Sequence, residues 1–145
     1  MKLSTRTRYG MRALLELALA DKGVPLQIKA IAERQSISNK YLEQLVAMLK
    51  TAGLVRSIRG PHGGYVLAAA PQDIKLSDVF RTLEGPVLTV ECVEHGEVCP
   101  NSADCATRKL WIQMNNAILS VLENKTLQTL VDMAGNEKRS MSYQI

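Results

Sequence analysis

The stretch "SISNKYLEQLVAMLKTAGLVRSIRGPHGGYVL", residues 36–67, joins a helical pattern to a hairpin pattern and decides the fold. Ser38 stands where a helix N-cap is expected. Four apolar residues follow at three- and four-residue spacing: Leu42, Leu45, Val46 and Leu49. Gly53 ends that pattern, and β-favouring residues then flank a turn rich in Gly and Pro. The stretch therefore predicts a helix from Ser38 to about Ala52 and a small hairpin directly after it.

The residues before this stretch predict two further helices. Apolar residues recur at helical spacing from Thr5 to Ala20, and a short second pattern runs from Leu26 to Gln35. Two short helices joined by a few residues, the second of them longer, form a helix-turn-helix, and a hairpin behind it makes a wing. A short capped helix from Ser77 to Gly85 completes the unit. We therefore expect a mostly α protein with a winged helix-turn-helix DNA-binding domain at residues 1–85.

The charge is unevenly divided along the chain. Residues 1–70 carry 11 Lys and Arg against 4 Asp and Glu, whereas residues 71–145 carry 7 against 10. A basic half suits a polyanion such as nucleic acid, although a solvated basic surface is the alternative. No apolar run approaches membrane-spanning length, so we expect a cytoplasmic protein without a membrane segment.

The three cysteines of the chain, Cys92, Cys99 and Cys105, all lie in a loop at residues 86–105. Cytoplasmic thiols stay reduced, which favours metal or redox chemistry over disulfides. Structural zinc prefers ligand pairs two to four residues apart, and the spacings here are longer, so an iron–sulfur cluster is favoured. A thiol redox or electron-transfer protein is the competing class, but no C-x-x-C pair supports it.

A long amphipathic helix is predicted from about Ala106 to Glu123. One face of it carries Leu110, Met114, Ala117, Ile118, Val121 and Leu122. The only later pattern is a short helix in "TLQTLVDMAG", residues 126–135, so we expect the long helix to pair with its copy in a homodimer. Folding back onto its own domain is the alternative. Residues 106–135 are thus the predicted dimerisation unit, and residues 136–145 a flexible tail.

Several blocks resemble one known family. "YGMRALLELA", "YLEQLV" and "GLVRSIRGPHGGYVL", followed by a three-cysteine loop and a long helix, resemble the IscR group of winged-helix repressors, the iron–sulfur cluster regulators. The resemblance implies a homodimer on near-palindromic double-stranded DNA and a cluster, 2Fe–2S, held by the three cysteines. It also implies control of genes for iron–sulfur assembly or sulfur metabolism, and no catalysis.

Such a dimer places candidate DNA-binding residues at two positions. The recognition helix offers Ser38, Asn39, Lys40, Tyr41, Glu43 and Gln44, and the wing tip offers Arg59, Gly60 and His62. Gln44 is suited to adenine, Glu43 to the amino group of cytosine, and Arg59 to a narrow minor groove. The alternatives are a packing role for Tyr41 and, for Glu43, an ion pair with Lys40 or Lys50.

The fourth cluster ligand stays open. IscR-type regulators have a histidine where this chain has Arg108, and the related NsrR type has a partner-subunit aspartate where it has Arg8. The remaining candidates are His95, Glu91, Glu94, Glu97 or Asp104 in the loop, Glu43 or another carboxylate on a neighbouring helix, and solvent. The "LEGP" turn is also similar to the CymR type of cysteine-metabolism repressor, which implies cysteine synthase as a further partner.

Overall fold

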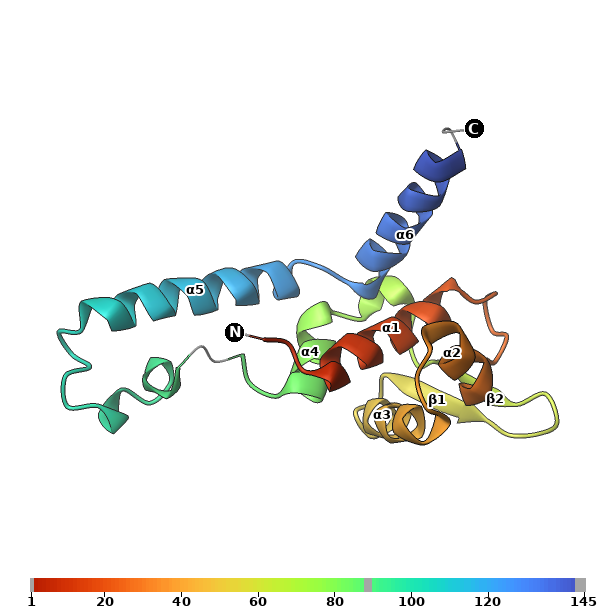
Figure 1. Ribbon diagram of the computed structural model, residues 1–145, viewed down its shortest axis with the longest axis horizontal. Helices are drawn as coiled ribbons and strands as arrows, with labels where there is room; N and C mark the ends of the chain where they lie inside the picture. Colours follow the sequence, from red (N-terminus) through yellow and green to blue (C-terminus); the bar gives the residue numbers. More distant parts are fainter. Residues whose placement is uncertain (1, 88–89, 143–145) are drawn as a thin grey trace.

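The structure is a computed structural model that describes residues 2–87 and 90–142. This part of the chain is mostly helical with one two-stranded antiparallel hairpin (Figure 1). The α-helices are α1 (Thr5–Leu19), α2 (Ile28–Gln35), α3 (Asn39–Thr51), α4 (Leu76–Glu84), α5 (Ala106–Glu123) and α6 (Leu127–Ser142). The strands are β1 (Val55–Ile58) and β2 (Gly64–Leu67), and the single-turn 3₁₀ helices are η1 (Pro71–Asp73), η2 (Glu91–Val93) and η3 (Gly96–Val98).

The hydrophobic core lies where α1, α3 and α4 pack together. Leu14 of α1, Leu45 of α3 and Leu83 of α4 are at most 1% exposed. The four apolar residues expected on the inner face of α3 are all buried, and Ser38 caps that helix by accepting a hydrogen bond from the backbone N–H of Tyr41. The prediction for this helix is therefore confirmed.

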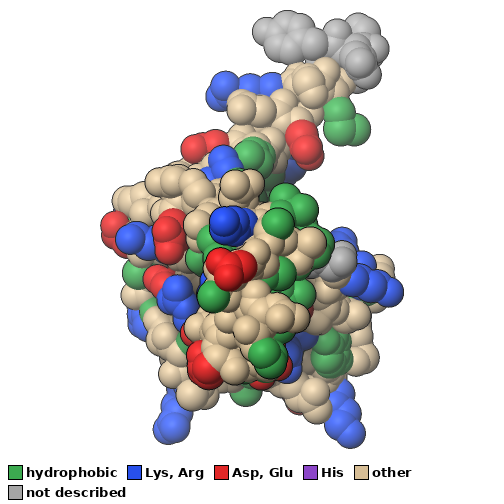
Figure 2. Space-filling model, turned by 90° about the vertical axis from the view of Figure 1, so that its left-hand side faces the viewer, with side chains coloured by type: hydrophobic (Ala, Val, Ile, Leu, Met, Phe, Trp, Pro, Cys, Tyr) green, Lys and Arg blue, Asp and Glu red, His purple; other side chains and the backbone are tan. Residues whose placement is uncertain are grey.

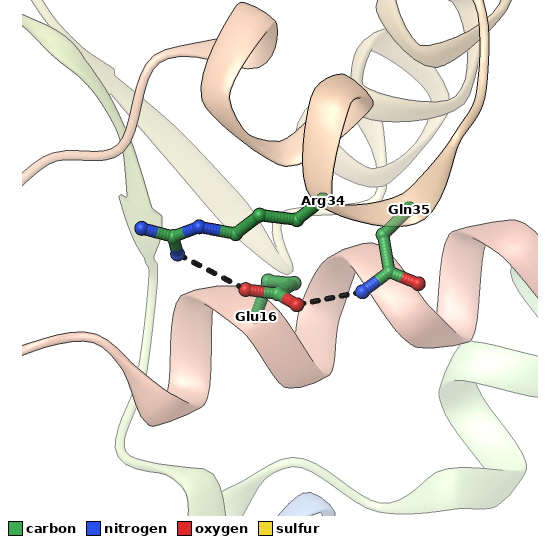
Figure 3. A network of polar contacts seen from close by, with 3 residues as sticks. All are labelled: Glu16, Arg34 and Gln35. Atoms are coloured by element: carbon green, nitrogen blue, oxygen red, sulfur yellow. Dashed lines mark hydrogen bonds and ion pairs between the residues drawn. The ribbon is translucent and has the colours of Figure 1, made fainter.

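Polar contacts fix α2 against α1 (Figure 3). The two carboxylate oxygens of Glu16 receive Arg34 Nη1 at 3.2 Å and Gln35 Nε2 at 2.6 Å. Directly after α2, Ser36 adopts φ 54° and ψ 45°, which turns the chain toward α3. The end of α2 is thus fixed on α1 at the point where the chain turns into α3.

The wing pairs Val55 with Leu67 and Ile58 with Gly64. It is tied to the helices through Leu26, whose N–H and C=O exchange hydrogen bonds with Tyr65 at 3.0 and 2.8 Å. A Cβ atom at Gly64 would clash with the carbonyl of Leu26, so this close approach requires glycine. The predicted hairpin is confirmed, and Leu26 belongs to its bridge rather than to α2, which begins at Ile28.

The C-terminal helices leave the winged-helix body in different directions (Figure 1). The start of α6 is anchored because Leu127 N–H donates to Ile74 C=O at 2.9 Å and Leu76 N–H donates to Lys125 C=O at 3.0 Å. Helix α5 contacts α4, and its far end, which carries the cysteine loop, extends away from the body (Figure 1). None of the helices in the described residues is long and apolar enough to cross a membrane.

Two other boundaries differ from expectation. Helix α4 begins at Leu76, and Lys75 precedes it without a side-chain cap, because the long-range bridge between Lys75 and Thr126 sets its start. Helix α6 continues to Ser142, so residues 136–142 are helical rather than a tail. Residues 143–145 of the predicted tail lie outside the described residues.

Candidate functional site

The outer face of α3 is polar and accessible. Asn39, Lys40, Glu43 and Gln44 are exposed, whereas the opposite face of the helix is buried. Ser38, at the N-terminal end, is exposed and uses its hydroxyl oxygen to cap the helix. This arrangement presents hydrogen-bonding side chains in the first turns, as a helix that enters a major groove must.

Tyr41 is half-buried between α3 and α1. Its ring lies edge-on to that of Tyr9, with centroids 6.3 Å apart and planes at 86°. The guanidinium carbons of Arg8 and Arg12 lie 5.9 and 5.8 Å from the centroid of the Tyr9 ring. The packing alternative for Tyr41 is therefore observed, and it connects the recognition helix to a basic part of α1.

The wing tip is exposed. Arg59, Gly60 and His62 all lie in the accessible turn between β1 and β2. Lys50 Nζ donates to Ser57 Oγ at 3.1 Å, which joins α3 to β1 at the base of the wing. Helix α3 and the wing are thus joined, and both carry exposed positive charge, at Lys40 and Arg59.

Glu43 keeps its side chain free among the described residues. The ion pairs found there do not include it, and Lys50, a candidate partner, donates to Ser57 instead. An exposed carboxylate on a helix that faces DNA is repelled by phosphate unless it meets a donor. Glu43 is consequently available to a partner that approaches this face.

The cysteine loop is folded over the first turn of α5. Cys92 lies in η2, Cys99 follows η3, and Cys105 is the N-cap residue of α5, as the sequence predicted for the third cysteine. All three are free thiols of intermediate exposure. Soft thiolates in one accessible loop suit an iron–sulfur cluster chemically.

Cys105 has a distinct environment. Its sulfur lies 3.1 Å from Thr107 Oγ1 and accepts the backbone N–H of Arg108 at 3.4 Å. These two hydrogen bonds, the Thr107 contact first, lower the pKa of the Cys105 thiol. The helix N-terminus therefore favours the thiolate form that ligation requires.

The candidate metal-ligating side chains of the loop do not converge on one point in the structure. No group of three His, Cys, Asp or Glu side chains converges at metal-binding distance in residues 2–87 and 90–142. His95 instead lies 3.4 Å from Glu97 and 3.9 Å from Glu94, and all three are exposed. Helix α3, with Glu43, lies apart from the loop of the same chain (Figure 1). Donor chemistry fits a cluster, but ligation requires the loop to close further.

Arg108, which stands where IscR-type regulators have a histidine, contacts the backbone of the cysteine loop. Its Nε donates to the carbonyl oxygen of Cys92 at 2.7 Å, so its guanidinium lies against the loop backbone. From the sequence alone, Arg108 was notable only because IscR-type regulators have a histidine at that position. Its contact crosses 16 residues of chain, which no local pattern indicates.

A second polar cluster was also missed by the sequence analysis. Glu84, the last residue of α4, accepts from Ser4 Oγ at 2.6 Å and from Thr7 Oγ1. These bonds, the Ser4 hydroxyl first, lower the pKa of the Glu84 carboxyl. Ser4 also caps α1 by accepting from Thr7 N–H at 3.1 Å. The start of α1 is thus fixed to the segment that leads into the cysteine loop.

The chain matches a family of regulators over most of its length. Residues 3–133 match the Rrf2 family, described as iron-dependent transcriptional regulators. The chain is 41% identical to the HTH-type transcriptional regulator CymR of Bacillus subtilis (strain 168), over 100% of both chains.

Two solved structures share the fold at high identity. The structure of CymR, the global cysteine regulator of B. subtilis, gives a TM-score of 0.80 at 42% identity and covers 92% of this chain and 98% of its own. The structure of IscR from T. potens gives a TM-score of 0.76 at 40% identity and covers 92% of this chain and 88% of its own. The winged-helix expectation is confirmed by this similarity.

Proposed function

The chain belongs to the Rrf2 family of transcriptional regulators, and we propose that it is a homodimeric repressor that senses iron–sulfur status through Cys92, Cys99 and Cys105. The observation that carries the proposal is the pairing of an exposed polar face on α3 and an exposed wing with three free cysteines in one loop. Its targets are genes for iron–sulfur assembly or sulfur metabolism. It acts in the cytoplasm, where DNA is accessible and thiols stay reduced.

DNA recognition rests on two parts of the same surface. Two recognition helices, one per protomer, read successive major grooves about 34 Å apart in a near-palindromic operator. Asn39, Lys40 and Gln44 contact base edges and phosphates, and Arg59 enters the minor groove with Gly60 and His62 beside it. The exposure of these residues supports the assignment.

The dimer forms through α5. Leu110, Met114 and Val121 are 49%, 40% and 55% exposed, although a helix with an apolar stripe normally buries it. Seen from the loop end, the surface shows hydrophobic side chains among charged ones (Figure 2). A two-fold axis across α5 covers this stripe with the same stripe of the partner, which is the usual geometry of a homodimer.

The cysteines hold a cluster, most simply 2Fe–2S. When bound, such a cluster supplies a labile, redox-sensitive group whose gain and loss the regulator senses. Cys105 provides a stabilised thiolate at the start of α5, while Cys92 and Cys99 approach from the loop as it closes. The fourth ligand is a loop side chain, His95 or a neighbouring carboxylate, a group from the partner, or solvent.

A CymR-like role in cysteine metabolism is the second candidate, because the identity to B. subtilis CymR extends over the full length of both chains. In that case the protein acts together with cysteine synthase and does not need a cluster. A thiol redox or electron-transfer protein is the third candidate, and the regulator family to which the chain belongs argues against it.

Anaerobic purification tests the proposal. The protein should carry iron and acid-labile sulfide in equal amounts and bind double-stranded DNA sequence-specifically. Sequence-specific binding without iron, together with complex formation with purified cysteine synthase, would favour the CymR-like role. Iron and sulfide without any specific DNA binding would favour an electron carrier.

A further inference from the structure

Arg108 links the segments that carry the first and third cysteines. Its backbone N–H donates to Cys105 Sγ at 3.4 Å, and its Nε reaches back across the loop to the carbonyl oxygen of Cys92 at 2.7 Å. A charge-assisted bond of this length is among the stronger ones in proteins. One residue on the first turn of α5 therefore holds both ends of the loop.

The guanidinium also lies against the middle of the loop. A Cβ atom placed on Gly96 would stand 3.3 Å from Arg108 Nη2 and 3.7 Å from Ser102 Oγ. Gly96 leaves room for this approach, and a larger side chain there would press on the guanidinium. The half-buried Arg108 is thus packed inside the loop, whereas the neighbouring Lys109 is exposed.

Residues 90–105 contain little regular structure and no buried side chain. The regular structure is limited to the single turns η2 and η3. The loop bears four exposed carboxylates and no Lys or Arg of its own. These acids are Glu91, Glu94, Glu97 and Asp104. Backbone hydrogen bonds within single turns order the loop locally, and the Arg108 guanidinium adds a long-range contact from α5.

We propose that Arg108 is a positioning residue, which keeps the cysteine loop folded on α5 when no cluster is bound. It does not ligate. It holds Cys92 and Cys105 in neighbouring segments, so that less of the chain has to be ordered when a cluster enters. This inference deepens the proposed function and rests on it for that last step, but the folding of the empty loop is independent of any cluster.

Hydrogen exchange of the reduced, cluster-free protein tests the first step. The amides of Val93, Glu94 and His95 bond to the carbonyl oxygens of Val90 and Glu91, at the start of η2, and report opening of the loop. Arg108→Ala should speed their exchange by about tenfold or more, since a bond to a charged group is lost. Lys109→Ala is the matched control, because it removes the same charge one residue away, and it should exchange like wild type.

Two further variants test whether the position of the guanidinium, and not only its charge, orders the loop. Arg108→Lys retains the charge but lacks the planar guanidinium, so its loop amides should exchange at a rate between those of wild type and Arg108→Ala. Gly96→Val displaces the guanidinium from the opposite side and should speed exchange as Arg108→Ala does. Amides of α3, measured in the same experiment, should not change. Wild-type exchange at η2 in both Arg108→Ala and Gly96→Val would overturn the proposal, as would equal acceleration by Lys109→Ala.

Anaerobic reconstitution with iron and sulfide tests the second step. Arg108→Ala should gain visible absorbance more slowly than wild type, by up to the factor seen in exchange, and reach the same final iron content. Equal uptake rates would overturn the part of the proposal that concerns cluster entry. If the wild-type protein takes up no cluster, the proposed function fails, while the exchange result still decides whether Arg108 orders the loop.

Discussion

Replacing Glu84 with glutamine should destabilise the winged-helix domain by about 1 kcal/mol at neutral pH. The carboxylate of Glu84 accepts from Ser4 Oγ at 2.6 Å, from Thr7 Oγ1, and from Ser4 N–H at 3.3 Å. Glutamine preserves the shape but carries no charge, so each bond becomes a neutral one. A bond to a charged group contributes about 1.5–3 kcal/mol and a neutral one about 0.5–1.5 kcal/mol.

Two effects reduce the total expected for this substitution. Glu84 is only half-buried, so solvent screens its interactions. It is also the last residue of α4, where a negative charge opposes the helix dipole, and removing that charge returns about 0.3–1 kcal/mol. The gross loss of about 2 kcal/mol for the two hydroxyl donors is thereby lowered to about 1 kcal/mol.

The effect should depend on pH in a defined direction. The pKa of Glu84 is lowered in the folded protein, chiefly by the hydroxyl of Ser4 and then by that of Thr7. Its stabilisation is therefore fully present above the pKa of the unfolded chain, about 4.3, and is lost as the pH falls through the lower folded value. The difference between wild type and Glu84→Gln should hold at pH 7 and shrink below about pH 4.

Urea denaturation at pH 7 and at low pH measures this difference. Glu123→Gln is the matched control. Glu123 is the exposed last residue of α5, so this substitution removes the same charge at the same helix position. The control should leave the free energy of unfolding nearly unchanged or slightly raised. Equal unfolding midpoints for the two variants, or a Glu84→Gln deficit that persists at low pH, would refute the reasoning.

Three further predictions concern function. Serine at Cys92, Cys99 or Cys105 should abolish stable cluster binding and leave the dimer folded, which iron analysis and size-exclusion chromatography measure; a fully loaded single variant contradicts joint ligation. Arg59→Ala should weaken operator binding by about 1–3 kcal/mol and flatten its salt dependence, and an unchanged affinity and slope would remove the wing from the interface. Glu43→Ala should relax base preference and let the cluster-free protein bind sites that otherwise need the cluster, measured on operators that differ only at the candidate cytosine. Identical preferences with and without Glu43 would exclude that role.

The sequence predicts the recognition helix and wing well because their signals are local. The cap at Ser38 and the apolar spacing of α3 lie within one helix, and the turn between β1 and β2 is marked by its own Gly and Pro residues. Each signal agrees with the packing that the domain imposes, so helix and hairpin appear where expected.

Boundaries set by distant residues were less predictable. Leu26 looked like the start of a helix but pairs with Tyr65 of β2, and the start of α4 depends on its bridge to Thr126. Helix α6 continues to Ser142 although its last two turns are exposed and, apart from Met141, polar, a pattern that also suits an unfolded tail. In each case a tertiary contact or a weak local preference decides the structure.

The candidate site, too, was predictable only where its signals are local in the sequence. Residue type alone identifies three thiols in one loop and an exposed recognition face. The contact of Arg108 with Cys92 and the bonds of Glu84 to Ser4 join residues 16 and 80 positions apart, so they require the fold. These long-range contacts connect the loop to α5 and the winged helix to the segment that precedes the loop.

The affinity for one operator, measured on one anaerobic preparation with its cluster and again after its removal, tests the central claim most directly. A near-palindromic operator, selected from random double-stranded DNA with the purified protein and titrated by fluorescence anisotropy, gives both values. We expect a cluster-containing dimer whose affinity differs between the two forms by about 5–150-fold, the usual size of such coupling. Equal affinities of the two forms, or a wild-type protein that carries no cluster when purified without oxygen, would contradict it.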